Sequence, residues 1–264
     1  MSRLILGSLV LALLLLVLLD KFSELQVHEG PPPSAAEPEA PAPRSPGLAN
    51  PPRSVAHGAE SPPVAEPSPI DRLARLAVRR RLRSEADQTY LDSLIAITDS
   101  VVRRWPDPQP ITLRVAILEG GPQGYTTRMA EFVREAFERW ESLGIGIRFA
   151  QQQDSVGSDI TVRWIDRFAI DRTGQTDLTW NRQGIIQRAS IRLAVSDPTG
   201  TPVGDIGLRT VALHEVGHAI GLPHSADPSD VMYPKAQATT PSDRDVRTAA
   251  LLYQLPPGDV RDRE

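Results

Sequence analysis

Three histidines and a glutamate lie within eleven residues in the last quarter of the chain. The segment reads His214-Glu215-Val216-Gly217-His218-Ala219-Ile220-Gly221-Leu222-Pro223-His224. On a helix, His214 and His218 are one turn apart on the same face, which is the spacing that two nitrogen ligands of one Zn²⁺ require. Glycine tolerates a positive φ, so Gly221 can end the helix sharply and let the chain carry His224 back toward the metal. The spacing therefore predicts one metal ion held by three imidazoles.

Glu215 directly follows the first of these histidines, and we expect that it does not bind the metal itself. Its carboxylate can reach a water molecule in the fourth coordination position, and Zn²⁺ lowers the pKa of such a water to about 7 in favourable sites. A neighbouring carboxylate can take a proton from that water during attack on a carbonyl and pass it to the leaving amine. The residue types therefore predict hydrolysis of peptide bonds by a metal-activated water, with Glu215 as the general base.

This pattern is improbable as an accident of composition. The chain of 264 residues contains 5 His, 18 Gly and 33 Asp+Glu, so finding the three histidines, the acid and the glycine at these offsets has a probability on the order of one in a hundred thousand. The other two histidines, His28 and His57, lie far upstream. We therefore interpret the histidines of the motif as one site.

Composition narrows the chemistry further. The chain has no Cys, which excludes disulfides, thiolate metal ligands, a cysteine nucleophile and a thiol-based latency switch. It has 29 Lys+Arg against 33 Asp+Glu, for a formal net charge of −4, and so lacks the strongly basic balance typical of nucleic-acid-binding proteins. We expect no nucleic-acid partner, and a metal site without sulfur.

Residues 1–22 are predicted to be a signal anchor or a signal peptide. Residues 4–19 form an uncharged, largely aliphatic segment between Arg3 and Asp20. As a helix it would be about 24 Å long, short of the ~30 Å hydrocarbon core but slightly long for a cleaved signal peptide. Because no clear cleavage site follows, the pattern favours an N-terminal hydrophobic helix that anchors an extracytoplasmic protein in the membrane, with secretion after cleavage as the alternative.

Two further segments precede the histidine motif's own domain. Residues 23–69 contain about half of the 25 prolines and are predicted to be a disordered, extended linker, with a ligand for a proline-binding partner as the alternative. Residues 70–106 are predicted to be a helical extension: an arginine-rich helix, then a second one that begins at Ser84 and stops before Pro106. Its arginines favour a solvated face, while contact with anionic lipid or a role as a prosegment stays open.

Residues 107–258 alternate between strand and helix patterns. Alternating or continuous apolar stretches predict strands, and 3.6-residue periodicity predicts helices; strands are expected at 111–118, 145–150, 160–165, 178–180 and 185–195, and helices at 126–143, at 206–222 and from Ser242 to about 255. This order indicates an α/β (α+β) domain with a mixed, mainly parallel twisted sheet. The histidine motif would lie on its long active-site helix, followed by a C-terminal helix.

The motif and its surroundings resemble the metzincin clan of zinc peptidases, and within it the matrixins, the matrix-metalloproteinase family. The extended histidine motif is followed directly by Ser225, and Asp230-Val231-Met232-Tyr233-Pro234 looks like the family's Met-turn. The resemblance extends over about 111–257 and is most specific from His214 to Pro234. It implies a metzincin-like catalytic domain in which Met232 lies beneath the three imidazoles.

The sequence also departs from this family. Without Cys, latency through a propeptide thiolate is not possible, and no spare histidine precedes the motif for the second, structural zinc of vertebrate members. Calcium loops are not recognisable at 167–177, so Ca²⁺ remains possible but is not indicated. By resemblance, 175–180 is the edge strand that binds an extended substrate, although a simple loop between two glycines fits this segment equally well.

We therefore predict an extracytoplasmic, zinc-dependent endopeptidase that acts on protein or peptide substrates as a monomer. His214, His218 and His224 would bind one catalytic Zn²⁺. One alternative is a non-catalytic, zinc-containing binding or adhesion module with a metzincin fold. Another is a peptidase in which a downstream glutamate, in place of His224, is the third ligand.

Overall fold

The computed structural model describes residues 69–96, 100–106 and 111–261. The predicted N-terminal hydrophobic helix and almost all of the predicted Pro-rich linker lie outside the described residues. Among the residues that are described, no helix has both the length and the apolar character needed to cross a membrane.

The centre of the fold is a five-stranded sheet with the order β3-β2-β4-β6-β5. The strands are β2 (Ile111–Ile117), β3 (Ile147–Gln152), β4 (Ile160–Ile165), β5 (Gly174–Trp180) and β6 (Ile186–Ala194). All neighbouring pairs are parallel except β5 with β6. This confirms the predicted mixed, mainly parallel sheet, and it places the one antiparallel strand at an edge.

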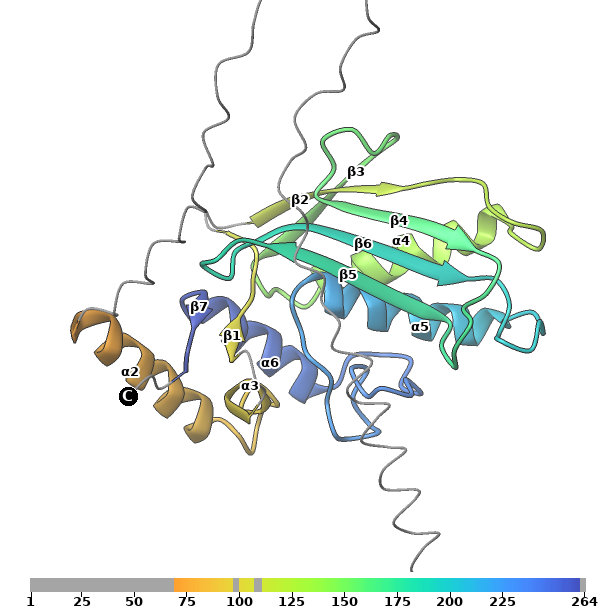
Figure 1. The fold of residues 1–264 in the computed structure, drawn as a ribbon. Helices are drawn as coiled ribbons and strands as arrows, with labels where there is room; N and C mark the ends of the chain where they lie inside the picture. Colours follow the sequence, from red (N-terminus) through yellow and green to blue (C-terminus); the bar gives the residue numbers. More distant parts are fainter. Residues whose placement is uncertain (1–68, 97–99, 107–110, 262–264) are drawn as a thin grey trace, which may run out of the picture.

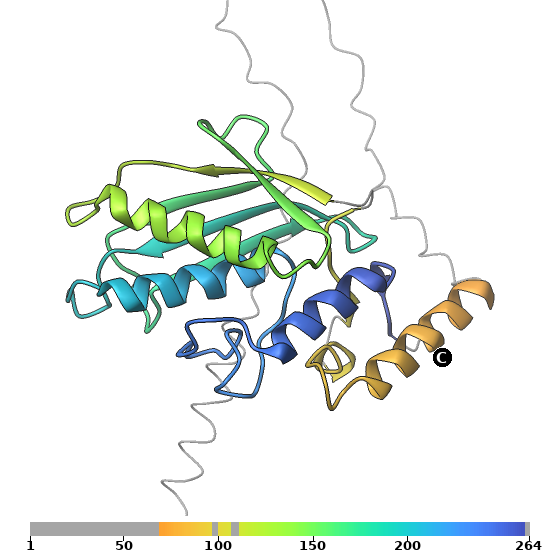
Figure 2. The ribbon, with the colours of Figure 1, turned by 180° about the vertical axis from the view of Figure 1, so that it is seen from behind.

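Two long helices, α4 (Thr127–Glu141) and α5 (Asp205–Ala219), cover one face of this sheet, as the two opposite views show (Figures 1 and 2). The core between the helices and the sheet contains Phe132, Phe137 and Trp140, all almost fully buried. The indole Nε1–H of Trp140 donates a hydrogen bond of 2.9 Å to the carbonyl oxygen of Leu213, so α4 is fixed against α5 one residue before the first histidine of the motif.

A second group of elements packs beyond the β5 edge of the sheet (Figure 1). It consists of α2 (Pro69–Ser84), α3 (Ser93–Ala96), β1 (Val101–Val102), α6 (Asp243–Gln254) and β7 (Gly258–Asp259). Helix α6 begins with a capping box, in which Ser242 and Asp245 each bind the other's backbone N–H. The short strands β1 and β7 pair antiparallel, so the segment before the sheet and the segment after α6 lie side by side.

The prediction of a second long helix after Ser84 is wrong. The structure instead has a turn, the four-residue helix α3 and the two-residue strand β1. Ser100 adopts φ 44°, in the left-handed region, which interrupts a right-handed helix. The apolar residues Tyr90, Leu91 and Leu94 are buried, but along an irregular path against the rest of the domain. The apolar spacing that predicted a helix thus identified residues that are buried, but their backbone is not helical.

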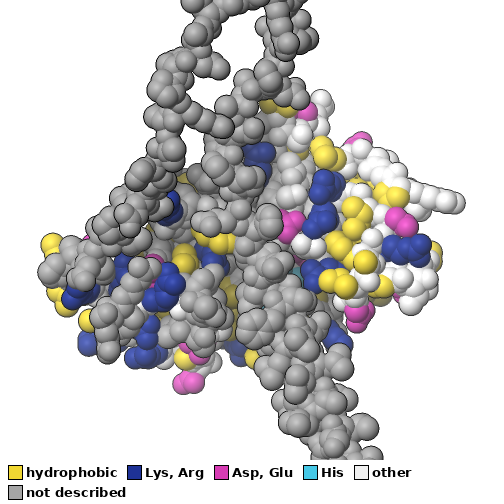
Figure 3. All heavy atoms as spheres, in the orientation of Figure 1, with side chains coloured by type: hydrophobic (Ala, Val, Ile, Leu, Met, Phe, Trp, Pro, Cys, Tyr) yellow, Lys and Arg dark blue, Asp and Glu magenta, His cyan; other side chains and the backbone are white. Residues whose placement is uncertain are grey.

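On the face drawn in Figure 3, basic side chains gather over the arginine-rich α2, whereas basic, acidic and apolar side chains are interspersed over the sheet.

Candidate metal centre

Helix α5 carries the first two histidines and ends just before the third. Its last residue is Ala219 and its C-cap is Ile220. Gly221 follows at φ 100°, and the N–H of Leu222 bonds back to the carbonyl of Gly217 at 3.1 Å. This is a glycine-terminated helix end in which the left-handed residue reverses the chain. The turn carries His224 back alongside the helix, as predicted.

The structure brings His214, His218 and His224 together. Each offers one ring nitrogen, and these three atoms lie within 4.8 Å of one another; the Nε2 atoms of His218 and His224 are 3.1 Å apart. His214 is buried, whereas the other two are half-buried, so the group is not fully enclosed. Three imidazole nitrogens at this spacing fit the ligand set of a catalytic zinc site.

Backbone carbonyls orient two of these rings. The Nδ1–H of His214 donates to the carbonyl oxygen of Val231 at 2.7 Å, and that of His218 donates to the carbonyl oxygen of Leu222 at 2.8 Å. Because a carbonyl only accepts, the proton lies on Nδ1 and the Nε2 lone pair is left for a metal. Burial lowers the pKa of both imidazoles, with further lowering at His218 by the neighbouring His214 and His224. Neutral imidazoles are the form that binds metal.

Met232 packs against the middle of α5. It is fully buried, and a Cβ added at Gly217 would overlap its Sδ and lie 3.1 Å from Cζ2 of Trp140. The N–H of Ser225 donates to the carbonyl of Met232 at 2.8 Å, which joins the residue after His224 to the turn. A glycine is therefore needed at position 217 so that Met232 can pack closely against α5. The sequence contains a signal for this contact, because a glycine lies inside a helix between two predicted metal ligands.

The side chain of Glu215, on α5, points toward β5. Its side chain is buried, and the hydroxyl of Thr176, on β5, contacts its Oε2 at 2.6 Å and its backbone carbonyl oxygen at 3.0 Å. Burial raises the pKa of Glu215 to about 7, against the lowering effects of the Thr176 hydrogen bond and of Arg172. The carboxylate is thus held in place and lies near the balance between its two protonation states at neutral pH.

The sequence interpretation missed Thr176 and Gly174. A Cβ added at Gly174 would lie 2.5 Å from Oε1 of Glu215, so this position on β5 leaves room for the carboxylate. Neither residue belongs to a recognisable motif, since their roles depend on contact between β5 and a helix about 40 residues later. The expected strand at 178–180 is longer and begins at Gly174.

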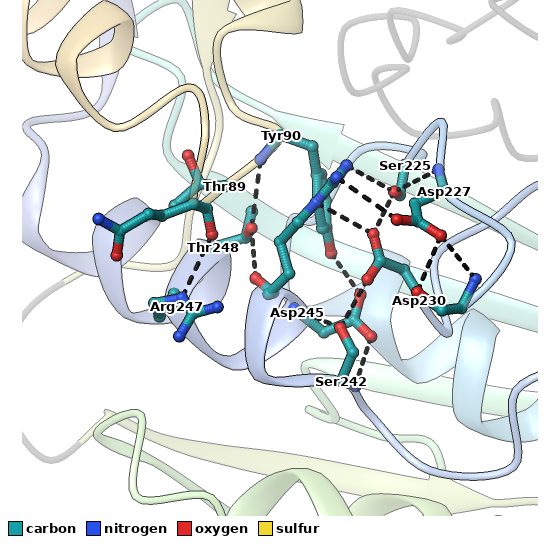
Figure 4. A network of polar contacts seen from close by, with 12 residues as sticks. Thr89, Tyr90, Ser225, Asp227, Asp230, Ser242, Asp245, Arg247 and Thr248 are labelled. Atoms are coloured by element: carbon teal, nitrogen blue, oxygen red, sulfur yellow. Dashed lines mark hydrogen bonds and ion pairs between the residues drawn. The ribbon is translucent and has the colours of Figure 1, made fainter.

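The segment after His224 is held by a network of polar side chains (Figure 4). Asp230 accepts hydrogen bonds from Ser225 and Ser242 and forms an ion pair with Arg244, Nε to Oδ2, at 3.1 Å. Asp245 Oδ2 accepts from the N–H of Val231 at 2.8 Å. These contacts join the third histidine's loop, the Met232 turn and the start of α6.

Comparison with known proteins agrees with this geometry. The family model described as Matrixin matches residues 104–254, which is more than half of the chain. One curated relative, matrilysin of Felis catus, is 44% identical over 57 residues, which are 22% of this chain and 18% of the relative; the alignment thus spans less than a fifth of that protein. The extent of the family match, together with the three converging imidazoles, shows that this chain belongs to the matrixin family of zinc metalloendopeptidases.

Proposed function

We propose that this protein is an extracytoplasmic endopeptidase that hydrolyses peptide bonds in proteins. One observation carries the proposal: three ring nitrogens lie within 4.8 Å of one another, on the same helix and turn as the buried carboxylate of Glu215. A purely structural zinc site needs four protein ligands and no adjacent acid, whereas this one offers three histidines and Glu215.

His214, His218 and His224 would hold one Zn²⁺ through Nε2. When bound, the ion supplies a Lewis acid that polarises the scissile carbonyl and makes a water molecule more acidic. The protein residues supply the rest. The carbonyls of Val231 and Leu222 keep both helix imidazoles in the Nδ1–H tautomer, and Met232 would form the apolar floor beneath the rings.

Glu215 acts as the general base and then as the general acid. A carboxylate held in this position can accept a proton from the attacking water and release it to the leaving amine. The Thr176 hydroxyl, 2.6 Å from Oε2, fixes one carboxylate oxygen and leaves the other for this proton.

The substrate binds along β5. This strand pairs only with β6 among the described strands, so its other edge can pair with an extended peptide through backbone hydrogen bonds. Because Thr176 of β5 contacts Glu215 directly, a peptide on this edge would run past the carboxylate.

The decisive experiment compares Glu215→Gln with the wild type in the full chain. The variant keeps all three histidines, so we expect stoichiometric zinc but a loss of peptide cleavage of about 10²–10⁴-fold, the usual contribution of a positioned general base. Glu131→Gln, at an exposed position on α4, is the matched control and should cleave like the wild type.

A chelator should abolish cleavage and added Zn²⁺ should restore it. Wild-type protein that binds zinc but cleaves no peptide in a substrate library would instead support the non-catalytic binding module. Equal activity of Glu215→Gln and wild type would overturn the assigned role of Glu215.

For the rest of the chain, we propose that residues 1–22 anchor the protein and that residues 23–69 hold the peptidase away from the membrane, with the folded unit acting as a monomer. The apolar segment 4–19 and the prolines that follow support this arrangement. Membrane flotation of the full chain, compared with a chain starting at residue 23, tests it; recovery of both proteins in the soluble fraction would favour secretion after cleavage.

A further inference from the structure

The segment that contains Tyr90, Arg103 and Trp105 contacts α6 and the end of α5 through these residues, although most of it precedes residue 104, where the match to the matrixin family begins. Its contacts are made by buried groups. Tyr90 and Trp105 are 4% and 2% exposed, and the phenol of Tyr90 donates a hydrogen bond of 2.9 Å to Oδ1 of Asp245 on α6 (Figure 4).

Tyr90 is connected to a zinc ligand through three hydrogen bonds. Its phenol binds Oδ1 of Asp245 at 2.9 Å, and Oδ2 of the same carboxylate accepts the N–H of Val231 at 2.8 Å. The carbonyl of Val231 in turn accepts the Nδ1–H of His214 at 2.7 Å. The N–H and the carbonyl of Val231 belong to successive peptide groups that meet at its Cα, so the coupling is positional: Tyr90 holds Asp245, Asp245 holds the backbone of Val231, and that backbone holds the imidazole of His214.

The chemistry of the two groups favours a hydrogen bond in which the Tyr90 phenol donates and the Asp245 carboxylate accepts. Burial and the adjacent Asp245 raise the pKa of Tyr90 well above its ordinary value, so the phenol stays protonated and remains a donor. Asp245 is fully buried, and leaving one of its oxygens without the Tyr90 hydrogen bond would carry a desolvation cost.

The same segment also encloses the turn that carries His224. The indole Nε1–H of Trp105 donates 2.8 Å to the carbonyl of Ala219, the last residue of α5. A Cβ added at Gly221 would lie 2.7 Å from the carbonyl oxygen of Arg103, whose guanidinium lies 4.1 Å from the ring centroid of Trp180 at the end of β5. The segment therefore touches the histidine turn and the proposed substrate strand.

We propose that Tyr90 is a positioning residue of the metal centre, and that the working peptidase begins upstream of residue 90 instead of at residue 107. The inference rests on the proposed function. It assigns residues 69–105 to the catalytic unit itself, so that a chain shortened to residue 107 would lose part of the support for His214 and for the histidine turn.

The test uses Tyr90→Phe in the full chain, because this change removes one oxygen atom and keeps the ring. Tyr125→Phe is the matched control, since the Tyr125 hydroxyl is buried without a hydrogen-bond partner in the described part of the chain. Zinc affinity is measured by competition with a chelator, and hydrogen exchange of the Val231 amide is measured in the zinc-free protein.

For Tyr90→Phe we expect the zinc dissociation constant to rise by about threefold to tenfold, somewhat less than the 10–100-fold effect of losing a direct outer-shell partner. The Val231 amide should exchange faster, and kcat should fall by a similar factor with KM nearly unchanged, while Tyr125→Phe matches the wild type. The absorption spectrum of the Co²⁺-substituted protein should shift for Tyr90→Phe alone.

A Tyr90→Phe protein with a lower melting temperature but wild-type zinc affinity, Co²⁺ spectrum and kcat would overturn the inference, because the phenol would then only stabilise the fold. Failure of the proposed function looks different. In that case the wild type cleaves no peptide, yet Tyr90→Phe still weakens zinc binding and speeds exchange at Val231.

Discussion

Two segments of this protein serve the same metal centre, one by carrying the three imidazoles and the other by contacting the elements that support them. From His214 to Met232, the functional residues act over short sequence distances: one helical turn, one glycine turn and one loop. From Tyr90 to Trp105, the contacts join residues more than a hundred positions apart, such as Trp105 with Ala219. The first segment has a recognisable motif, whereas the second has none.

The difference is one between residues that would bind the metal and residues that hold those ligands in position. Metal ligands need fixed residue types at fixed spacing, so their pattern is visible in a sequence. A supporting residue needs only a donor or a close-packed surface at one point in space, and many residue types at many positions can provide it. The following variants probe the two segments, from the largest expected effect to the smallest.

Removing the third ligand should have the largest effect. In His224→Ala, two imidazoles remain, and we expect zinc affinity to fall by more than the roughly 10–100-fold that loss of an outer-shell partner costs, with cleavage lost in parallel. Zinc content after dialysis measures this, and His57→Ala, outside the motif, is the control. Full zinc affinity in His224→Ala would indicate a downstream glutamate as the third ligand.

Thr176→Val should reduce activity and leave zinc affinity unchanged. The hydroxyl contacts Oε2 of Glu215 at 2.6 Å, and a hydrogen bond to a charged group contributes about 1.5–3 kcal/mol, so we expect kcat/KM to fall by roughly 10–100-fold. Thr176→Ser keeps the hydroxyl and should restore most of the activity. If Thr176→Val cleaves like the wild type, the carboxylate is positioned by other contacts.

Gly217→Ala should destabilise the fold, although alanine is the better helix former by about 1 kcal/mol. The added methyl would overlap Sδ of Met232, and overpacking of this kind costs about 1–3 kcal/mol. Gly207→Ala, in the first turn of α5, meets only a Val203 methyl at 3.0 Å and is the control. Urea unfolding of the zinc-free proteins compares them, and a more stable Gly217→Ala would show that Met232 moves aside freely.

Trp105→Phe should have the smallest effect. It removes the hydrogen bond from the indole to Ala219, which is worth about 1 kcal/mol of unfolding free energy. Trp164→Phe makes the same change where the indole N–H is buried without a partner among the described residues, so the difference between the two variants isolates the hydrogen bond. Equal destabilisation would mean that the upstream segment contributes packing alone.

Much of the folded domain could be predicted from local patterns. Strand β4 occupies the predicted residues, α4 and α6 lie within the predicted helices, and α5 begins one residue before its predicted start at 206. The apolar periodicity of α4 and α6 is strong, whereas α5 has almost none and is marked in the sequence by the histidine motif and by the glycine after its end. The convergence of the three histidines followed from the same reasoning, since one helix and one turn determine it.

The rest depended on contacts between distant residues. The apolar spacing around Tyr90 and Leu94 fits a helix, but burial against α6 and the left-handed Ser100 produce an irregular path. The length of β5 depends on pairing with β6, and the hydrogen bond from Thr176 to Glu215 depends on how that strand lies against α5. Local propensity has no access to these tertiary contacts.

The pairing of β1 with β7 also determines when the fold can be completed during synthesis. Val101 pairs with Asp259, and the N–H of Val260 bonds to the carbonyl of Ser100 at 2.9 Å. Domains fold as units while chains leave the ribosome from the N-terminus, and a contact of such long range forms late. The segment that precedes Trp105 is therefore tied to the C-terminal end of the domain, and a nascent chain can complete this pairing only after residue 260 has been made.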